Sequence, residues 1–350
     1  MTEPSRGYQR RISYGLERAL QSARRSTLRL DDAATRWVIF SDHHRGERDP
    51  SDDFAHAEQA YHAALGYYLE AGYKLALLGD VEEFWENRFE PVLKTYHATY
   101  ELERVFHTRG GLLRVWGNHD DEWRHPSQVD KYLGPLLPGI RVEESFLLDA
   151  QSHGETMGQI LLTHGHQGAL AADTLSGLTR ILDRYIWRPL QRLTHFNPNT
   201  PATSLALRRR HGIALYNWAV SKPGLVLIAG HTHHPIFDPG LQVEEQLRAL
   251  DAARQAGDPG LIARARAQVE HLKVLENRQG FRMSQPSYFN TGCCCFADGD
   301  ITGIELEGGI IKLVRWTKKT FQPEVLARAD LQLIFERVAS TGLEAAPLPG

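Results

Sequence analysis

The chain has 350 residues, of which 42% are hydrophobic and 24% are charged, a composition typical of globular proteins. A formal net charge of −3 disfavours a general binder of nucleic acid or other polyanions. No apolar run has the length of a signal peptide core or a membrane-spanning helix, so we expect a soluble, cytoplasmic protein, with contact to a membrane surface left open.

Residues 1–35 are predicted to form an arginine-rich helical segment ahead of the main domain. Ile12, Leu16 and Leu20 recur at helical spacing, and the arginines around them are expected to form a solvated face.

The predicted main domain, residues 36–320, contains five short apolar runs that each end in a polar cluster. The runs have the length and content of buried strands. Helical patterns at 54–71 and 91–108 fill the first two gaps, and this alternation predicts an α/β layered domain. Because sites in such domains form where strands end, we expect the five clusters to converge. The runs begin at Arg36, Lys74, Leu112, Gln159 and Gly224.

The polar clusters contain carboxylates, imidazoles and one carboxamide, which suit borderline transition metals. Asp42 and His44 lie two residues apart on a segment that we expect to be extended, so both face one side, and His231 and His233 do the same. Seven donors of this mix suit two divalent ions, and a carboxylate such as Asp80 can bridge them. Mn, Fe, Zn, Ni and Co all fit, and we favour Mn. The predicted ligands are Asp42, His44, Asp80, Asn118, His164, His231 and His233.

His119 and Asp120 follow the predicted ligand Asn118 directly. An imidazole held by a carboxylate can donate a proton to a leaving group or stabilise phosphate charge. A water shared by two ions is acidified towards neutral pH and becomes a nucleophile. The pattern therefore predicts hydrolysis of a phosphate ester or pyrophosphate by a metal-activated hydroxide, with His119 and Asp120 as the catalytic residues.

The ordered motifs resemble those of the calcineurin-like metallophosphoesterase superfamily over about residues 37–316, apart from two insertions at 168–222 and 241–280. They are Asp42-x-His44, Gly79-Asp80, Gly117-Asn-His-Asp120, His164-Gly-His166 and Gly230-His-x-His233. The resemblance implies two mixed β-sheets packed as a sandwich and flanked by helices. It also implies how the ions are held: one by Asp42, His44, Asp80 and His233, the other by Asp80, Asn118, His164 and His231.

The stretch Gly79-Asp-Val-Glu-Glu-Phe-Trp85 is similar to a motif of bacterial UDP-2,3-diacylglucosamine pyrophosphohydrolases. This similarity implies a lipid-nucleotide substrate. That family usually has Arg at the position of His119 and Asp at the position of His166. The long insert at 241–278 is a third departure of this chain from the family pattern.

Residues 168–222 are predicted to be a basic cap, with eight basic residues against two acidic ones. Arg180, Arg184 and Arg188 recur every fourth residue, which places them on one helix face. We expect these guanidinium groups and His166 to contact substrate phosphate. A surface for anionic lipid and a solvated helix are the alternatives.

Three further segments lie outside the predicted ligand motifs. Residues 241–280 predict a helical hairpin around a turn at 257–260, packed on the body or forming a dimer contact, so the oligomeric state stays open. Residues 321–350 are predicted to be a C-terminal tail. Cys293, Cys294 and Cys295 are adjacent, so disulfides among them cannot cross-link distant parts of the fold. We expect them to be buried thiols in a strand rather than metal ligands or redox groups.

Other functions stay open at this point: a nuclease or cyclic-nucleotide phosphodiesterase, a protein phosphatase, a non-catalytic metal-bound scaffold, and a peripheral membrane module that binds anionic lipid. The basic residues gather in one insertion rather than along a track, which disfavours nucleic acid. The complete ligand set disfavours the scaffold. The expected substrate is a phosphorylated small molecule or a lipid-nucleotide.

Overall fold

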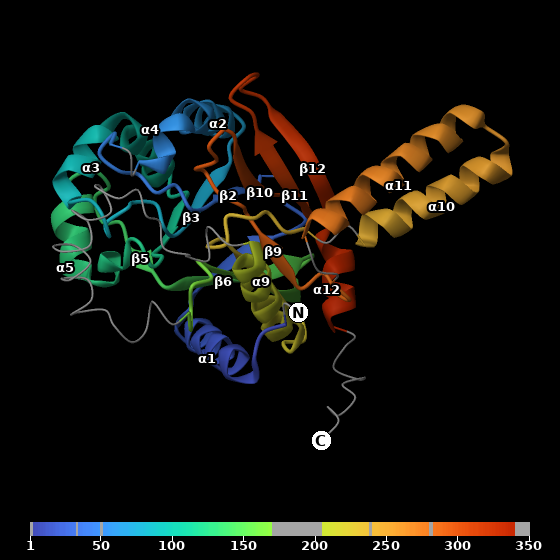
Figure 1. Ribbon diagram of the computed structural model, residues 1–350, viewed down its shortest axis with the longest axis horizontal. Coiled ribbons are helices and arrows are strands. Elements are labelled where there is room, and N and C mark those ends of the chain that lie inside the picture. Colours follow the sequence, from blue (N-terminus) through green and yellow to red (C-terminus); the bar gives the residue numbers. More distant parts are fainter. Residues whose placement is uncertain are drawn as a thin grey trace.

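A computed structural model describes residues 3–32, 34–49, 52–169, 205–237, 240–279 and 283–339 (Figure 1). The predicted cap arginines Arg180, Arg184 and Arg188 lie outside these residues. Of the predicted cap, the described part is residues 168 and 169 and the helix α9 (Leu205–Val220) with the turn after it.

A seven-stranded sheet forms one half of the core, in the order β12-β11-β10-β2-β3-β4-β5. Strands β2 to β5 run parallel, whereas β10, β11 and β12 are antiparallel to their neighbours. Gly308 and Gly309, both with positive φ, form the predicted turn between β10 and β11. The strands are β2 (Arg36–Phe40), β3 (Lys74–Leu78), β4 (Leu112–Val115), β5 (Val142–Glu143), β10 (Ile301–Glu307), β11 (Ile310–Trp316) and β12 (Pro323–Asp330).

A five-stranded sheet forms the other half, in the order β1-β6-β7-β8-β9. Its strands are parallel except for the antiparallel pair β6 and β7. Both sheets are therefore mixed. The strands are β1 (Arg24–Arg29), β6 (Ser145–Ser152), β7 (Glu155–Thr163), β8 (Leu225–Ala229) and β9 (Tyr288–Asn290).

The two sheets pack face to face because their strands are apolar on both sides. In β2, Trp37 and Ile39 join the core between the sheets, while Val38 and Phe40 point to the opposite face and pack under helices. Ile160 of β7 and Val226 of β8 belong to the same inter-sheet core. This alternation explains why the strands appear in the sequence as continuous apolar runs.

Helices cover the outer face of each sheet (Figure 1). On the seven-stranded sheet lie α2 (Glu58–Glu70), α3 (Phe89–Thr95) and α4 (His97–Thr108), with the short elements η1 (Asp53–His56), η2 (Asp121–Arg124), α5 (Pro126–Gln128) and η3 (Val129–Leu133). On the five-stranded sheet lie α1 (Arg6–Ser22) and α9. The order helix, sheet, sheet, helix confirms the predicted α/β class with two mixed sheets. Across the described stretches of the chain, no helix combines the length and apolar character that a membrane span requires.

The sheets extend beyond the predicted domain limits of 36–320. Strand β1 lies in the predicted N-terminal segment, yet its Leu28 is buried in the inter-sheet core. Strand β12 and helix α12 (Leu331–Ala339) lie in the predicted tail, and Ile334 and Phe335 of α12 join the same core. Both strands were missed because polar residues surround their few buried side chains.

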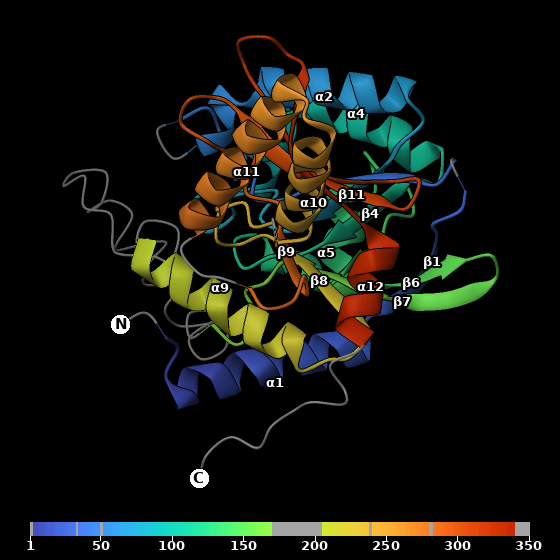
Figure 2. The same ribbon diagram turned by 90° about the vertical axis from the view of Figure 1, so that its right-hand side faces the viewer.

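Helices α10 (Gly240–Ala256) and α11 (Pro259–Gln279) form the predicted hairpin, which projects from the body beside β12 (Figures 1 and 2). Leu250 and Ala253 of α10 and Ala265 and Val269 of α11 are buried. A cavity of about 1000 Å³ lies between the hairpin and strands β11 and β12, and its lining includes none of the predicted metal ligands.

Candidate metal centre

Five loops meet at one end of the sandwich. They follow the carboxyl ends of β2, β3 and β4 in one sheet and of β7 and β8 in the other. Parallel strands bring such ends to one edge, as the sequence predicted. The result is three overlapping groups whose ligand atoms lie within 4.8 Å of one another: Asp42, His44 and His233; His44, Asp80 and His119; and Asp80, His164 and His231.

Asp42 links the two sheets. Its two carboxylate oxygens accept hydrogen bonds from the backbone amide of His231 at 3.1 and 2.9 Å. Its Oδ1 also lies 3.2 Å from Nε2 of His233. A residue that follows β2 therefore holds the loop that follows β8.

Asp80 lies at the middle of the cluster. Its Oδ2 is 3.0 Å from Nε2 of His164 and 3.8 Å from Nε2 of His44. Its Oδ1 accepts a hydrogen bond from the backbone amide of His119 at 2.8 Å. One carboxylate thus faces imidazoles on two sides, which is the position that a bridging ligand needs.

The imidazole rings are oriented by partners on their outer side. Nδ1 of His164 donates to the carbonyl of Leu78 at 2.7 Å, and Nδ1 of His44 lies 2.9 Å from Oε2 of Glu83. Nε2 of each ring is left facing the cluster, where that of His44 lies 3.1 Å from Nε2 of His233. Outer partners of this kind fix ring orientation and tautomer in metal sites.

Three predicted ligands have a buried donor atom without a hydrogen-bond partner in the described part of the chain: Oδ1 of Asn118, Nε2 of His164 and Nε2 of His231. An unpaired buried polar atom costs about 1–3 kcal/mol, and a bound cation would remove that cost for each of them. Carboxylate, imidazole and carboxamide donors together suit divalent transition metals. The residues present therefore fit divalent metal ions.

Five predicted ligands have a left-handed backbone, with φ between 50° and 68°: Asp42, His44, Asp80, His231 and His233. A non-glycine residue in this conformation reduces stability by about 1–3 kcal/mol, and the conformation persists where surrounding contacts hold it. The expectation that the pairs Asp42–His44 and His231–His233 lie on extended segments is therefore wrong. Each pair faces the cluster because its loop turns sharply there, and not because side chains alternate along a strand.

Two glycines allow the loops to approach so closely. A Cβ on Gly79, which has φ of +82°, would lie 2.6 Å from the backbone nitrogen of Gly117 and 2.9 Å from Cβ of His164. A Cβ on Gly230 would strike the hydroxyl of Ser41 and the carboxylate of Asp42. Any other residue at either position would push the ligand loops apart.

His119 is held beside the cluster by its neighbours. Its Nδ1 lies 2.6 Å from Oε2 of Glu83. The ring of Trp85 stacks on it, with centroids 4.0 Å apart and 21° between the planes, and the ring of His44 meets it edge-on at 4.7 Å. The imidazole is therefore fixed in position by three side chains.

Asp120 does not hold His119, and that part of the prediction is wrong. Its carboxylate instead accepts hydrogen bonds from the backbone amides of Gly117 at 2.6 Å, Val81 at 2.9 Å and Asp80 at 3.2 Å. Burial, together with the nearby charges of Glu82 and Asp80, raises the pKa of Asp120 to about 7. Asp120 thus ties the loop after β3 to the loop after β4.

Glu83 is the residue that sequence reasoning missed. Although burial alone would raise its pKa, the charge of His119 and hydrogen bonds from His119 and His44 lower it to about 2, so the carboxylate stays ionised. Conversely, although burial lowers the pKa of His44, the hydrogen bond to Glu83 and the charges of Asp80, Glu83 and Asp42 together raise it to about 10. The sequence signal that could have identified Glu83 is the motif Gly79–Trp85. This motif contains both Glu83 and Trp85, but the resemblance gave neither residue a role.

His211 of α9 connects the helical layer to the cluster and was also missed. The hydroxyl of Tyr8 lies 2.6 Å from its Nδ1, and its Nε2 donates to the carbonyl of Gly165 at 2.7 Å. Its ring centroid is 4.9 Å from that of His231. Burial lowers the pKa of His211 to about 4, so the ring is neutral.

His166, predicted to contact substrate, is buried beside the cluster. Its ring centroid lies 5.3 Å from that of His164 and 5.1 Å from that of Trp116. Its Nδ1 has no hydrogen-bond partner within the described stretches. Contact between His166 and a substrate stays a prediction.

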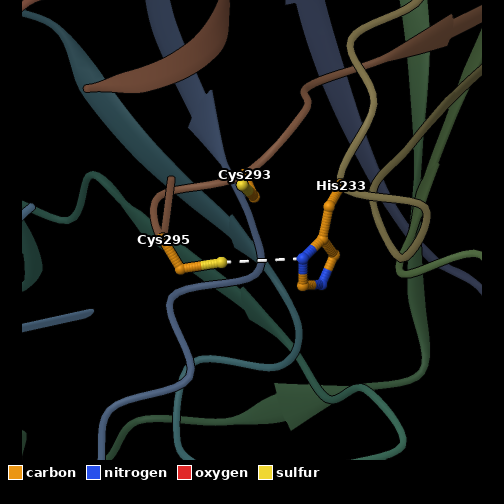
Figure 3. A group of neighbouring side chains, drawn as sticks. All are labelled: His233, Cys293 and Cys295. Atoms are coloured by element: carbon orange, nitrogen blue, oxygen red, sulfur yellow. Dashed lines mark hydrogen bonds between the residues drawn. The ribbon is translucent and has the colours of Figure 1, made fainter. Parts of the chain in front are cut away.

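The cysteine run follows β9 in a loop, so its predicted place in a strand is wrong. Cys293 and Cys294 are buried as expected, whereas Cys295 is partly exposed. Figure 3 shows that Cys295 points to His233, with its Sγ 3.6 Å from Nδ1 of that ring.

No protein-family model and no curated protein matches the chain. Among solved structures, the chain is similar to Vacuolar Protein Sorting 29 from Cryptosporidium parvum, with 12% sequence identity and a TM-score of 0.34 over 85% of this chain and 97% of that chain. A superposition this loose has no bearing on function.

Proposed function

We propose that this chain hydrolyses a phosphate ester or pyrophosphate bond with the help of two divalent metal ions. The supporting observation is the position of Asp80, whose Oδ2 lies 3.0 Å from His164 and 3.8 Å from His44. A carboxylate in this position can contact two ions at once, and ions about 3.5–4 Å apart are typical of phosphate-ester hydrolases. The motif resemblance to calcineurin-like metallophosphoesterases points to the same reaction.

The ligands divide between two positions that share Asp80. Asp42, His44 and His233 belong to the first position. His164 and His231 belong to the second, together with the unpaired Oδ1 of Asn118. When bound, the ions supply a nucleophile from water near neutral pH and offset the charge of the phosphate. The mixture of oxygen and nitrogen donors accommodates Mn, Fe, Zn, Ni and Co, of which Mn is our first choice to test.

His119 acts on the leaving group. Burial lowers the pKa of His119, but the charges of Glu83 and Asp80 and the hydrogen bond to Glu83 together outweigh burial and raise the pKa above its ordinary value, which favours the protonated imidazole. Trp85 and Glu83 hold the ring still. A protonated imidazole in a fixed position can give its proton to the departing oxygen.

The motif Gly79–Trp85 suggests which class of phosphorylated substrate to test. Its similarity to UDP-2,3-diacylglucosamine pyrophosphohydrolases supports a nucleotide-linked pyrophosphate as one substrate to test. Simple monoesters and diesters are the other two, since the same pair of ions can serve all three bonds.

The test is hydrolysis by metal-stripped protein after Mn²⁺ is added back. The substrates are p-nitrophenyl phosphate, bis-p-nitrophenyl phosphate and a UDP-linked pyrophosphate. We expect Mn²⁺-dependent cleavage of at least one, abolished in Asp80→Ala and kept in the control Asp298→Ala, whose side chain is 61% exposed. Two bound ions with no turnover on any substrate would contradict the proposal and favour a metal-bound scaffold.

A further inference from the structure

A second donor cluster lies on the outer side of His233. Nε2 of this ring faces the candidate metal centre, at 3.2 Å from Oδ1 of Asp42. Nδ1 faces away from it, towards the sulfur of Cys295 at 3.6 Å (Figure 3). The sulfur of Cys293 completes this group, in which all three ligand atoms lie within 4.8 Å of one another. The two nitrogens of the His233 ring therefore face two different groups of potential ligands.

The loop that carries the sulfurs is fixed by its backbone. The amide of Cys294 donates to the carbonyls of Ser41 and Asp42, at 3.2 and 3.0 Å, and the carbonyl of Cys293 accepts from the amide of Thr302 at 3.1 Å. Cys294 packs in the apolar core beneath α2, with residues such as Phe40. Cys293 and Cys295 share the group with His233, so the middle thiol is set apart from the outer two.

Two thiols and an imidazole form the donor set of thiophilic cations such as Zn²⁺ and Cd²⁺. Tetrahedral bonds of about 2.3 Å to sulfur and about 2.0 Å to nitrogen put these ligand atoms about 3.5 Å apart. The observed separation between Cys295 and His233 is 3.6 Å. Cys295 and His233 are partly exposed, which leaves a fourth position accessible to water.

We propose that Cys293, Cys295 and Nδ1 of His233 form a binding site for one thiophilic divalent cation, separate from the ions held by Asp42 and Asp80. When the cation binds, both thiols and the remaining N–H of the His233 ring release their protons to solvent, and two sulfur–metal bonds and one metal–Nδ1 bond form. The deprotonated ring of His233 then connects this cation to the candidate centre through its two nitrogens.

The test is a Cd²⁺ titration of the reduced, Mn²⁺-loaded protein, followed by the ultraviolet sulfur-to-cadmium charge-transfer band. We expect the band to saturate at one Cd²⁺ per chain. It is lost in Cys293→Ala and Cys295→Ala and kept in the matched control Cys294→Ala. Cd²⁺ that replaces Mn²⁺ at the candidate centre meets only oxygen and nitrogen donors there and gives no such band, so this result does not depend on whether the chain hydrolyses phosphate.

Absence of the band in the wild type, or its survival in both single variants, would overturn the site. So would its loss in Cys294→Ala alone. Alkylation of the wild type gives a second readout that needs no folded variant. Bound Cd²⁺ is expected to slow the modification of Cys295, as followed by peptide mass spectrometry, and an unchanged rate contradicts the proposal.

Discussion

Glu83 connects a predicted metal ligand to the predicted proton donor, because one carboxylate oxygen lies near Nδ1 of both His44 and His119. Glu83→Gln removes the charge but keeps the size. We expect turnover and Mn²⁺ affinity to fall by about 10- to 100-fold, the usual effect of losing an outer partner of a metal ligand. Steady-state rates and Mn²⁺ titrations measure the two effects.

The matched control is Glu90→Gln, which makes the same change on an exposed residue of α3. It should leave both quantities unchanged. Wild-type turnover and affinity in Glu83→Gln would show that the two contacts do not position the imidazoles.

His211 should make the stability of the metal-free protein depend on pH. Its pKa is about 4 in the folded chain and about 6.5 in an unfolded one, so folding disfavours its protonated form. The unfolded state gains protons first, and stability falls as the pH drops from about 6.5 to about 4, by about 3 kcal/mol for this group. Denaturant unfolding in chelator at a series of pH values measures the fall.

His211→Gln should show a smaller fall over the same pH range, whatever its stability at neutral pH. The exposed His97, changed to Gln in the same way, serves as the control and should follow the wild type. An identical pH dependence in all three proteins would exclude His211 as a source of the effect.

Much of the candidate site could be predicted at the scale of single residues, because its ligands lie in short motifs at strand ends. The partners that orient those ligands could not. Glu83 is 39 residues from His44, and His211 is 46 from Gly165, so only the fold reveals these contacts. The error over Asp120 has the same origin, since neighbours in a sharply turning loop need not point the same way.

At the scale of secondary-structure elements, the strands that carry the ligands were predicted because burial on both faces gives them unbroken apolar sequences. Strand β1 (Arg24–Arg29) lies at the edge of its sheet, and its burial pattern has one fully buried residue, Leu28. Strand β12 is likewise an edge strand with polar residues along it. Such strands carry little periodic signal and are recognised only by their pairing.

The α10–α11 hairpin is an element that the candidate centre should not need. The hairpin projects from the body (Figure 1). The cavity at its base is lined by none of the predicted metal ligands. Replacing residues 240–279 by a short Gly/Ser linker is expected to leave Mn²⁺ binding unchanged, as measured by titration and by thermal unfolding with and without metal.

Removal of α12, in contrast, is expected to prevent folding. Ile334 and Phe335 of this helix are fully buried in the core between the sheets. A folded protein that lacks the hairpin but no longer binds Mn²⁺ would contradict this division of roles.

At the scale of the whole molecule, the candidate centre exists because two sheets pack with their strand ends together. Neither sheet holds a complete ligand set: Asp42, His44, Asp80 and Asn118 follow strands of one sheet, and His164, His231 and His233 follow strands of the other. The carboxylate of Asp42 accepts from the amide of His231 and so joins the two halves. Metal binding should therefore stabilise the packing of the sheets as well as serve chemistry.

The number of Mn²⁺ ions bound per chain tests the central claim most directly. It is measured by elemental analysis after equilibrium dialysis of the wild type, Asp80→Ala and the control Asp298→Ala. Two ions in the wild type and in the control, with one or none in Asp80→Ala, are the result that a shared bridging carboxylate predicts. Fewer than two in the wild type, or two retained in a folded Asp80→Ala, would contradict a dinuclear centre built on Asp80.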